Sequence, residues 1–182
     1  LIRARLAEAV GENDLVIISA GSSAGTRDFT ADTIAELGEV LVHGVAMKPG
    51  KPAILGRIRG KPVIGLPGYP LSAVTVLREI VSPLLALYGL PRESGAMVPA
   101  ILSSTLASEL GVEEFVFLSV GRIRGRWVAV PHGRGAGVQM SGVRANAYLS
   151  IPAGREGVEA GEEVEARLTV PVEEAERALI LT

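Results

Sequence analysis

Residues 14–28 read Asp14-Leu15-Val16-Ile17-Ile18-Ser19-Ala20-Gly21-Ser22-Ser23-Ala24-Gly25-Thr26-Arg27-Asp28. The first six residues include a short, continuous apolar run, which is typical of a strand buried in a parallel sheet. The residues after it are mostly Gly, Ala and Ser, and Asp28 or Thr30 can cap a helix that continues to about Leu37. A strand, a small-residue turn and a helix in this order indicate an α/β domain.

Two further tracts have the same character, because each follows an apolar, strand-like run. Lys48-Pro49-Gly50-Lys51-Pro52 follows a run over 39–47, and Leu66-Pro67-Gly68-Tyr69-Pro70-Leu71-Ser72 follows runs over 52–59 and 61–66, joined by a turn at Arg59-Gly60. A helix is predicted from Pro70 to Gly89, kinked or restarted at Pro83. The alternation of strands and helices predicts a three-layer α/β domain over residues 1–92.

The pattern changes after Pro91 to regularly spaced strands with glycine turns. A hairpin turn is predicted at Arg124-Gly125, between strands over 97–102, 115–123, 126–131, 145–151 and 164–170. This predicts a small all-β, barrel-like domain over residues 93–171, with the boundary near Leu90 to Gly95. Residues 172–182 are predicted to be a linker.

Composition excludes several classes of protein. The chain has 182 residues, of which 48% are hydrophobic, so it can bury a core. A net charge of −2 argues against a general nucleic-acid binder, and the absence of cysteine excludes disulfides and thiolate chemistry. No uninterrupted apolar run reaches the roughly 18 residues that span a bilayer, and no signal peptide is visible. We therefore expect a cytoplasmic protein without a membrane or nucleic-acid partner. Because the chain begins at Leu1 inside a helical pattern, we also expect a fragment.

The three tracts predict the handling of a phosphate or another oxyanion. Turns at one edge of a sheet can converge on one ligand, and small residues let backbone N–H groups approach an anion. Lys48 and Lys51, two of the three lysines, add positive charge. The first turn is neither a Walker loop nor a G-x-G-x-x-G fingerprint. Each tract can also be a purely structural turn, and Asp28 can be either a simple helix cap or a ligand of a hydroxyl or hydrated Mg²⁺.

The remaining polar residues give weaker indications. His43 and His132 are isolated in the sequence, which favours strand or loop histidines without a metal. The tract 133–137 is glycine-rich and could bring Arg134 to an anion, or it could be an ordinary barrel loop.

Taken together, the three tracts resemble the molybdopterin molybdotransferase family, to which the gephyrin E domain also belongs. Residues 19–30 are similar to the family's Ser-Gly-Gly-x-Ser-x-Gly-x-x-Asp-x-Thr, and residues 66–72 to its Leu-Pro-Gly-Asn-Pro-x-Ser, with Lys48 to Pro52 between them. The resemblance runs from about Leu15 to Leu168. It implies a three-layer molybdopterin-binding domain, incomplete at its N-terminus, followed by a small C-terminal barrel domain.

The resemblance also implies an activity. Family members insert molybdenum from molybdate into adenylylated molybdopterin (molybdopterin-AMP), in a Mg²⁺-dependent step that releases AMP. They are homodimers whose site includes N-terminal domains that this chain lacks, so the chain alone is expected to be inactive. A molybdopterin adenylyltransferase is the implied upstream partner.

Site residues are carried over by position. Asp28, Lys48 and Lys51 are implied to be catalytic, with Asp28 also near the Mg²⁺. The implied binding residues are Ser19, Gly21, Ser22, Ser23, Gly25, Pro67, Gly68, Pro70 and Ser72.

Three positions depart from the family pattern: Ala20 replaces a usual glycine, Tyr69 a frequent asparagine, and Arg27 precedes Asp28 as in adenylyltransferases. Two alternatives therefore stay open. A molybdopterin adenylyltransferase would share the first and third tracts, but we would not expect it to have the lysine tract or the β domain. A non-catalytic pterin carrier or scaffold is the other alternative.

Overall fold

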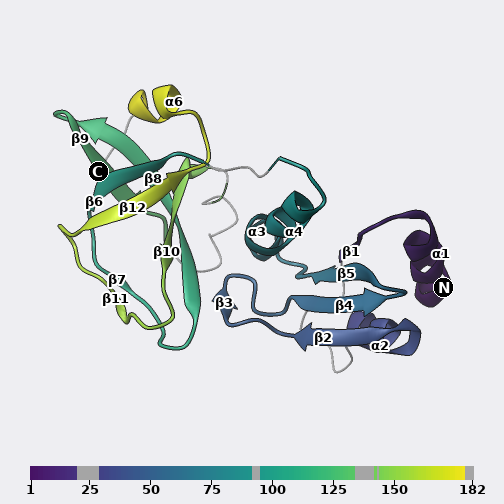
Figure 1. Cartoon of the computed structure of the whole chain (residues 1–182). Helices are drawn as coiled ribbons and strands as arrows, with labels where there is room; N and C mark the ends of the chain where they lie inside the picture. Colours follow the sequence, from purple (N-terminus) through teal and green to yellow (C-terminus); the bar gives the residue numbers. More distant parts are fainter. Residues whose placement is uncertain (20–28, 92–94, 134–141, 143, 179–182) are drawn as a thin grey trace. The chain divides into compact units, whose positions relative to one another are not determined.

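The computed structural model of the chain describes residues 1–19, 29–91, 95–133, 142 and 144–178. The chain forms two compact units (Figure 1): Leu1–Val45 with Pro49–Pro91, and Ala46–Lys48 with Arg92–Thr182. The first unit is an α/β domain and the second is a β-barrel, which confirms the predicted fold class.

The first unit is built on a mixed sheet, which has four strands in the described part of the chain, in the order β1-β5-β4-β2. The strands are β1 (Val16–Ser19), β5 (Lys61–Leu66), β4 (Ile54–Ile58) and β2 (Glu39–His43). Only β1 and β5 are parallel; β4 and β5 form a hairpin.

Two details of this sheet bear on the predictions. Arg59 and Gly60 both have positive φ (51° and 79°), which closes the predicted hairpin turn as in a type I′ turn. By contrast, β1 is an outermost strand of the described sheet, and Ile17 is 38% exposed. The prediction of a parallel strand is confirmed for β1, but the strand is only partly buried, because β5 is its one neighbour among the described strands.

Helices α1 (Ile2–Glu12) and α2 (Phe29–Leu37) cover one face of this sheet. Ile34 of α2 is fully buried, and it packs in one cluster with the side chains Leu6, Val10, Ala31, Ile54, Ile58 and Val63. Gly56 of β4 lets α2 approach, because an added Cβ would lie 2.5 Å from Ile34 Cγ2. The apolar faces of the two helices and of the strands thus pack against each other in one core.

A continuous helical segment from Pro70 to Leu87 provides the third layer (Figure 1). It comprises α3 (Pro70–Val76), the π-helical turn η1 (Leu77–Val81) and α4 (Ser82–Leu87). Ile64 and Leu66 are buried and alternate with Val63 along β5, so they point to the face opposite α2. Pro83 has no N–H to donate, and the predicted restart of the helix at this position takes the form of a π-turn, in which Ser82 N–H bonds to Leu77 O, followed by α4.

The same segment is apolar overall, although Arg78 and Glu79 interrupt its apolar run. Its 18 residues have a mean hydropathy of 1.5, long and apolar enough to cross a membrane by length and composition alone, and 17% of the segment is buried. One such helix is weak evidence, since the core helix of a soluble protein passes the same test.

The second unit is a closed barrel, for which the described residues give the strand order β10-β12-β6-β9-β8, closed by pairing of β10 with β8. Arg124 and Gly125 (φ 50° and 81°) form the predicted hairpin turn. The core contains fully buried Leu118, Val120 and Ile151. The strands are β6 (Met97–Leu102), β8 (Glu113–Ile123), β9 (Arg126–Pro131), β10 (Ala147–Ile151) and β12 (Glu163–Leu168).

Four short elements of the second unit were not predicted. Strand β3 (Met47–Lys48) pairs in parallel with the start of β8 and thus belongs to the second unit, although residues 1–92 were assigned to the first domain. Strands β7 (Leu106–Ala107) and β11 (Gly157–Val158) form a separate ribbon. Helix α6 (Val172–Glu176) stands where a linker was predicted, because Ala175 is buried in the barrel core.

Candidate functional site

Each of the three tracts begins or ends at the same end of the strands in the first unit's sheet. Ser19, the last residue of β1, lies directly beside Leu66, the last residue of β5. Ile54, the first residue of β4, pairs with Gly65, so the tract that precedes β4 reaches the same edge. The strand registers thus place the ends of β1 and β5 and the start of β4 together, and crevices at strand ends are the usual place for ligands in α/β sheets.

The turn that carries Lys51 has a defined backbone. Ala53 N–H donates to Gly50 O at 3.0 Å, and Val45 N–H donates to Lys51 O at 2.9 Å. Gly50 has a φ of 124°, a conformation that other residues rarely adopt. Because the backbone of Lys51 is fixed while its side chain is exposed, the amine extends from a rigid base.

Lys48 has a different setting. It is the last residue of β3, pairs with Glu114 of β8, and is exposed. The whole tract was predicted to lie in the first domain, residues 1–92. The structure instead places Lys48 on a strand of the barrel and Lys51 in the turn that enters β4.

The third tract combines a buried proline with backbone N–H groups at the start of a helix. Pro67 is buried, Gly68 and Pro70 are exposed, and Ser72 is half-buried. Tyr69 occupies the N-cap of α3 without a side-chain cap, and the first backbone bond runs from Ala73 N–H to Tyr69 O. The N–H groups of the two residues before Ala73 therefore point out of the helix start and can donate to an anion.

The other predicted site residues lie outside the described part of the chain. These are Gly21, Ser22, Ser23, Gly25 and Asp28, together with Arg134. Among the described residues, no group of three or more His, Asp or Glu side chains could hold a metal ion. The magnesium site thus remains a prediction that rests on Asp28 alone.

One polar group was missed by the sequence analysis. Ser119 Oγ lies 2.8 Å from His132 Nε2, and Ser119 was not considered at all. Partial burial, and secondly the charge of Arg144, lower the pKa of His132 from its ordinary value of 6.5. The available signal was strand alternation, which turns Ser119 outward between the buried Leu118 and Val120.

The fold and the sheet edge define a class of protein: an α/β ligand-binding domain followed by a small barrel. Two families match these parts. "Probable molybdopterin binding domain" matches residues 1–87, and "MoeA C-terminal region (domain IV)" matches residues 99–168. The chain belongs to the molybdopterin molybdotransferase (MoeA) family, in which it carries the molybdopterin-binding domain and the C-terminal barrel domain.

Individual relatives agree with this assignment. A protein of Methanocaldococcus jannaschii named for molybdopterin biosynthesis is 36% identical over 88% of this chain and 37% of its own length. A molybdopterin molybdenumtransferase of Staphylococcus aureus is 29% identical over 96% of this chain and 42% of its own. The crystal structure of a molybdopterin biosynthesis MoeA protein from Pyrococcus horikoshii has a TM-score of 0.72 and 41% identity, covering 92% of this chain and 40% of that one. The chain thus spans about two fifths of the length of these relatives.

Proposed function

We propose that this chain supplies the pterin- and oxyanion-binding part of a molybdopterin molybdotransferase, which inserts molybdenum from molybdate into adenylylated molybdopterin and releases AMP. The observation that carries the proposal is the position of three strand ends: Ser19 lies beside Leu66, and Ile54, at the start of β4, pairs with Gly65. Membership in the family and the names of the relatives support the proposed reaction class.

Each described residue has a role that follows from its position. Lys51, on its fixed turn, neutralises an oxyanion. Lys48 is retained from the sequence motif as a second lysine to test. The exposed start of α3 donates N–H groups to a phosphate, with buried Pro67 holding the turn in place. We propose no protein nucleophile, because a molybdate oxygen can attack while the protein aligns the reactants and stabilises the developing charge.

Mg²⁺ is handled separately. The described residues offer no cluster that fits the ion, so no step is assigned to it here. We retain Asp28 as the residue to test for a water-mediated Mg²⁺ contact.

The assembly is part of the same proposal. The complete enzyme would be a cytoplasmic homodimer that acts after a molybdopterin adenylyltransferase and contacts neither nucleic acid nor membrane. The presence of the barrel domain favours the molybdotransferase over the adenylyltransferase alternative.

The test is removal of the two lysines in the full-length protein. Lys48→Ala and Lys51→Ala should each weaken molybdate or molybdopterin-AMP binding roughly ten-fold or more, since a hydrogen bond to a charged group contributes about 1.5–3 kcal/mol. Isothermal titration and an AMP-release assay measure the two effects.

Lys61→Ala is the matched control, because Lys61 lies at the opposite end of β5 and donates to Val10 O at 2.9 Å. It should lower stability without weakening binding. Unchanged affinity and turnover in both tract variants would refute the proposal, and binding without turnover by the wild type would support the carrier alternative. Soaking crystals with molybdate, followed by anomalous scattering, locates the molybdenum directly.

A further inference from the structure

The barrel holds a second polar group, away from the tracts that define the proposed reaction. Ser119 Oγ lies 2.8 Å from His132 Nε2 and 3.5 Å from the backbone oxygen of Arg144. We propose that Ser119, His132 and Arg144 form a binding site for a tetrahedral oxyanion, of the phosphate or molybdate class, on the outer surface of the barrel.

The barrel strands build this group from three separate segments. Ser119 pairs with Val130 of β9, and His132 continues that ladder by donating its N–H to Phe117 O at 3.0 Å. His132 is thus diagonal to Ser119 on the same face, a spacing that long or aromatic side chains can bridge. Since the core-facing neighbours Leu118 and Val120 are buried, Ser119 faces outward.

The third segment is held on the other side of β8 by Asn146. Its backbone N–H donates to Leu118 O at 3.1 Å. Its side-chain amide accepts from Val120 N–H at 2.7 Å and donates to Val120 O at 2.8 Å, as a paired strand would. These three bonds fix the backbone of the segment that carries Arg144 beside Ser119.

The group of Ser119, His132 and Arg144 carries positive charge and contains no acidic residue. Arg144 is exposed, and its positive charge acts on His132, whose imidazole is also partly desolvated. Across the ranges that the structure describes, neither Arg144 nor His132 forms an ion pair with a carboxylate. A guanidinium, an imidazole and a hydroxyl without an acidic partner form the donor set that binds phosphate-like anions.

Anion binding at this group is coupled to proton uptake. A protonated His132 donates from Nε2 to Ser119 Oγ, which leaves the Ser119 O–H free to donate to the anion. The competing acceptor, the backbone oxygen of Arg144, is at the long limit of 3.5 Å. Arg144 contributes a fork of donors that matches two anion oxygens. An anion therefore stabilises the charged imidazole, which the empty group disfavours.

The group can be followed through its own imidazole, because His43 and His132 are the two histidines of the chain. NMR titration of both imidazoles gives their pKa values in phosphate, in molybdate and in chloride at matched ionic strength. Either oxyanion should raise the pKa of His132 by about one unit or more, equivalent to about ten-fold tighter binding to the protonated form. His132 should not respond in chloride, and its response to either oxyanion should be lost in Arg144→Gln. A response to only one oxyanion identifies the ligand; an equal shift in chloride, or an undiminished shift in Arg144→Gln, shows general screening and overturns the proposal.

Variants separate this site from the proposed catalytic tracts. Arg144→Gln should weaken phosphate or molybdate binding at least about ten-fold. Arg126→Gln removes the same charge from an exposed position of the same barrel and should leave binding unchanged. Ser119→Ala should weaken binding without unfolding the protein, as checked by Trp127 fluorescence. Equal effects of the two arginine variants, or no effect of either, contradict the proposal. Lys51→Ala should preserve the His132 response, so the two proposals fail independently.

Discussion

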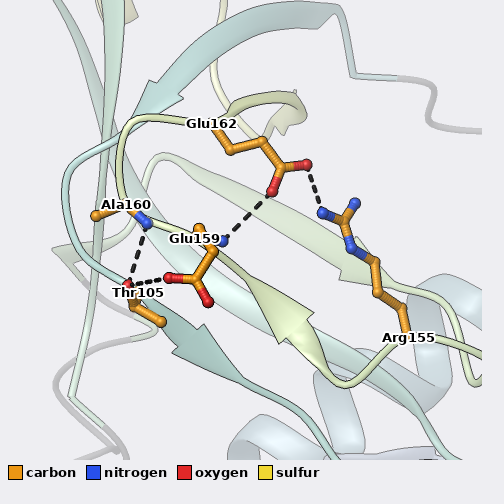
Figure 2. Close-up of polar contacts among 5 residues, drawn as sticks. All are labelled: Thr105, Arg155, Glu159, Ala160 and Glu162. Atoms are coloured by element: carbon orange, nitrogen blue, oxygen red, sulfur yellow. Dashed lines mark hydrogen bonds and ion pairs between the residues drawn. The ribbon is translucent and has the colours of Figure 1, made fainter.

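Glu162 connects two turns of the barrel through both of its carboxylate oxygens (Figure 2). Oε1 accepts a hydrogen bond from Arg155, and Oε2 accepts one from Glu159 N–H at 3.3 Å. Thr105 extends the network, donating to Glu159 Oε2 at 3.0 Å and accepting from Ala160 N–H at 3.1 Å. The network thus joins the segment before β7 to the turn between β11 and β12.

The hydrogen bond from Arg155 is the main cause that lowers the pKa of Glu162 from its ordinary value of 4.5. A carboxyl with a lowered pKa in the folded state adds stability above its unfolded pKa, and this stability is lost as the pH falls through the folded pKa. The contribution of Glu162 is therefore present at neutral pH and disappears below pH 4.5.

We predict that Glu162→Gln lowers the free energy of unfolding at neutral pH and that the difference from wild type vanishes in acid. The effect is small because the group is exposed to solvent. Urea unfolding at several pH values measures it. Glu163→Gln, at an exposed neighbouring position, is the control and should not change the pH profile. Parallel stability curves for wild type and Glu162→Gln would show that the bonds to Glu162 contribute nothing.

The packing of α2 on β4 depends on a missing side chain. An added Cβ at Gly56 would lie 2.5 Å from Ile34 Cγ2 and 3.0 Å from Glu39 O. We predict that Gly56→Ala destabilises the protein by about 1–3 kcal/mol, because the buried Ile34 has little space to move. Chemical denaturation measures this.

Gly11→Ala is the matched control, since nothing lies within 4 Å of its added Cβ in α1. It should be neutral or stabilising by up to about 1 kcal/mol, because alanine favours a helix over glycine. A Gly56→Ala variant as stable as wild type would mean that α2 can shift away from β4.

Helix α6 is held on the barrel by a buried alanine and an ion pair. Ala175 is fully buried, and Glu176 Oε1 lies 2.7 Å from Arg122 Nη1. Arg122 also lies over the ring of Trp127, 5.9 Å from its centroid, and Trp127 packs partly buried on the same core. The environment of this single tryptophan therefore reports whether α6 is docked.

We predict that Ala175→Asp releases α6, because an unpaired carboxylate in the core costs more than the helix gains by packing there. The fluorescence of Trp127 should shift to longer wavelength and become more accessible to quenchers. Glu173→Gln, at an exposed position of the same helix, should leave the spectrum unchanged. An unaltered spectrum in Ala175→Asp would contradict the docking role.

The chain passes between the two units around β3 and again near Pro91. The first passage is held in the barrel sheet, where Glu113 N–H donates to Ala46 O at 2.9 Å. Leu90, at the second passage, is 51% exposed. We predict that a protease of broad specificity first cuts between about Leu90 and Gly95, because exposed boundaries are nicked most easily. Mass spectrometry of the fragments identifies the cut. Earlier cleavage within 46–52 would show that the β3 pairing opens more readily than the boundary.

Local sequence rules predicted much of this molecule. The hairpin turns at Arg59-Gly60 and Arg124-Gly125, strands β6 and β9, and the helix beginning at Pro70 all follow from residue type and periodicity over a few neighbours. The sheet-edge position of Ser19 and of the third tract was predictable too, because each directly follows a strand. The family could be identified from three sequence motifs in a fixed order, because recognising them requires no knowledge of which residues are in contact.

Only the tertiary structure decided which strand pairs with which. The alternation of apolar residues shows that a segment has a buried face, but not what covers that face. Strand β3 therefore pairs with the barrel strand β8, although it lies in the sequence between strands of the first unit. Ala175 is buried where a linker was expected. The grouping of Ser119, His132 and Arg144 has the same origin, because residues up to 25 positions apart meet only through the registers of β8 and its neighbours.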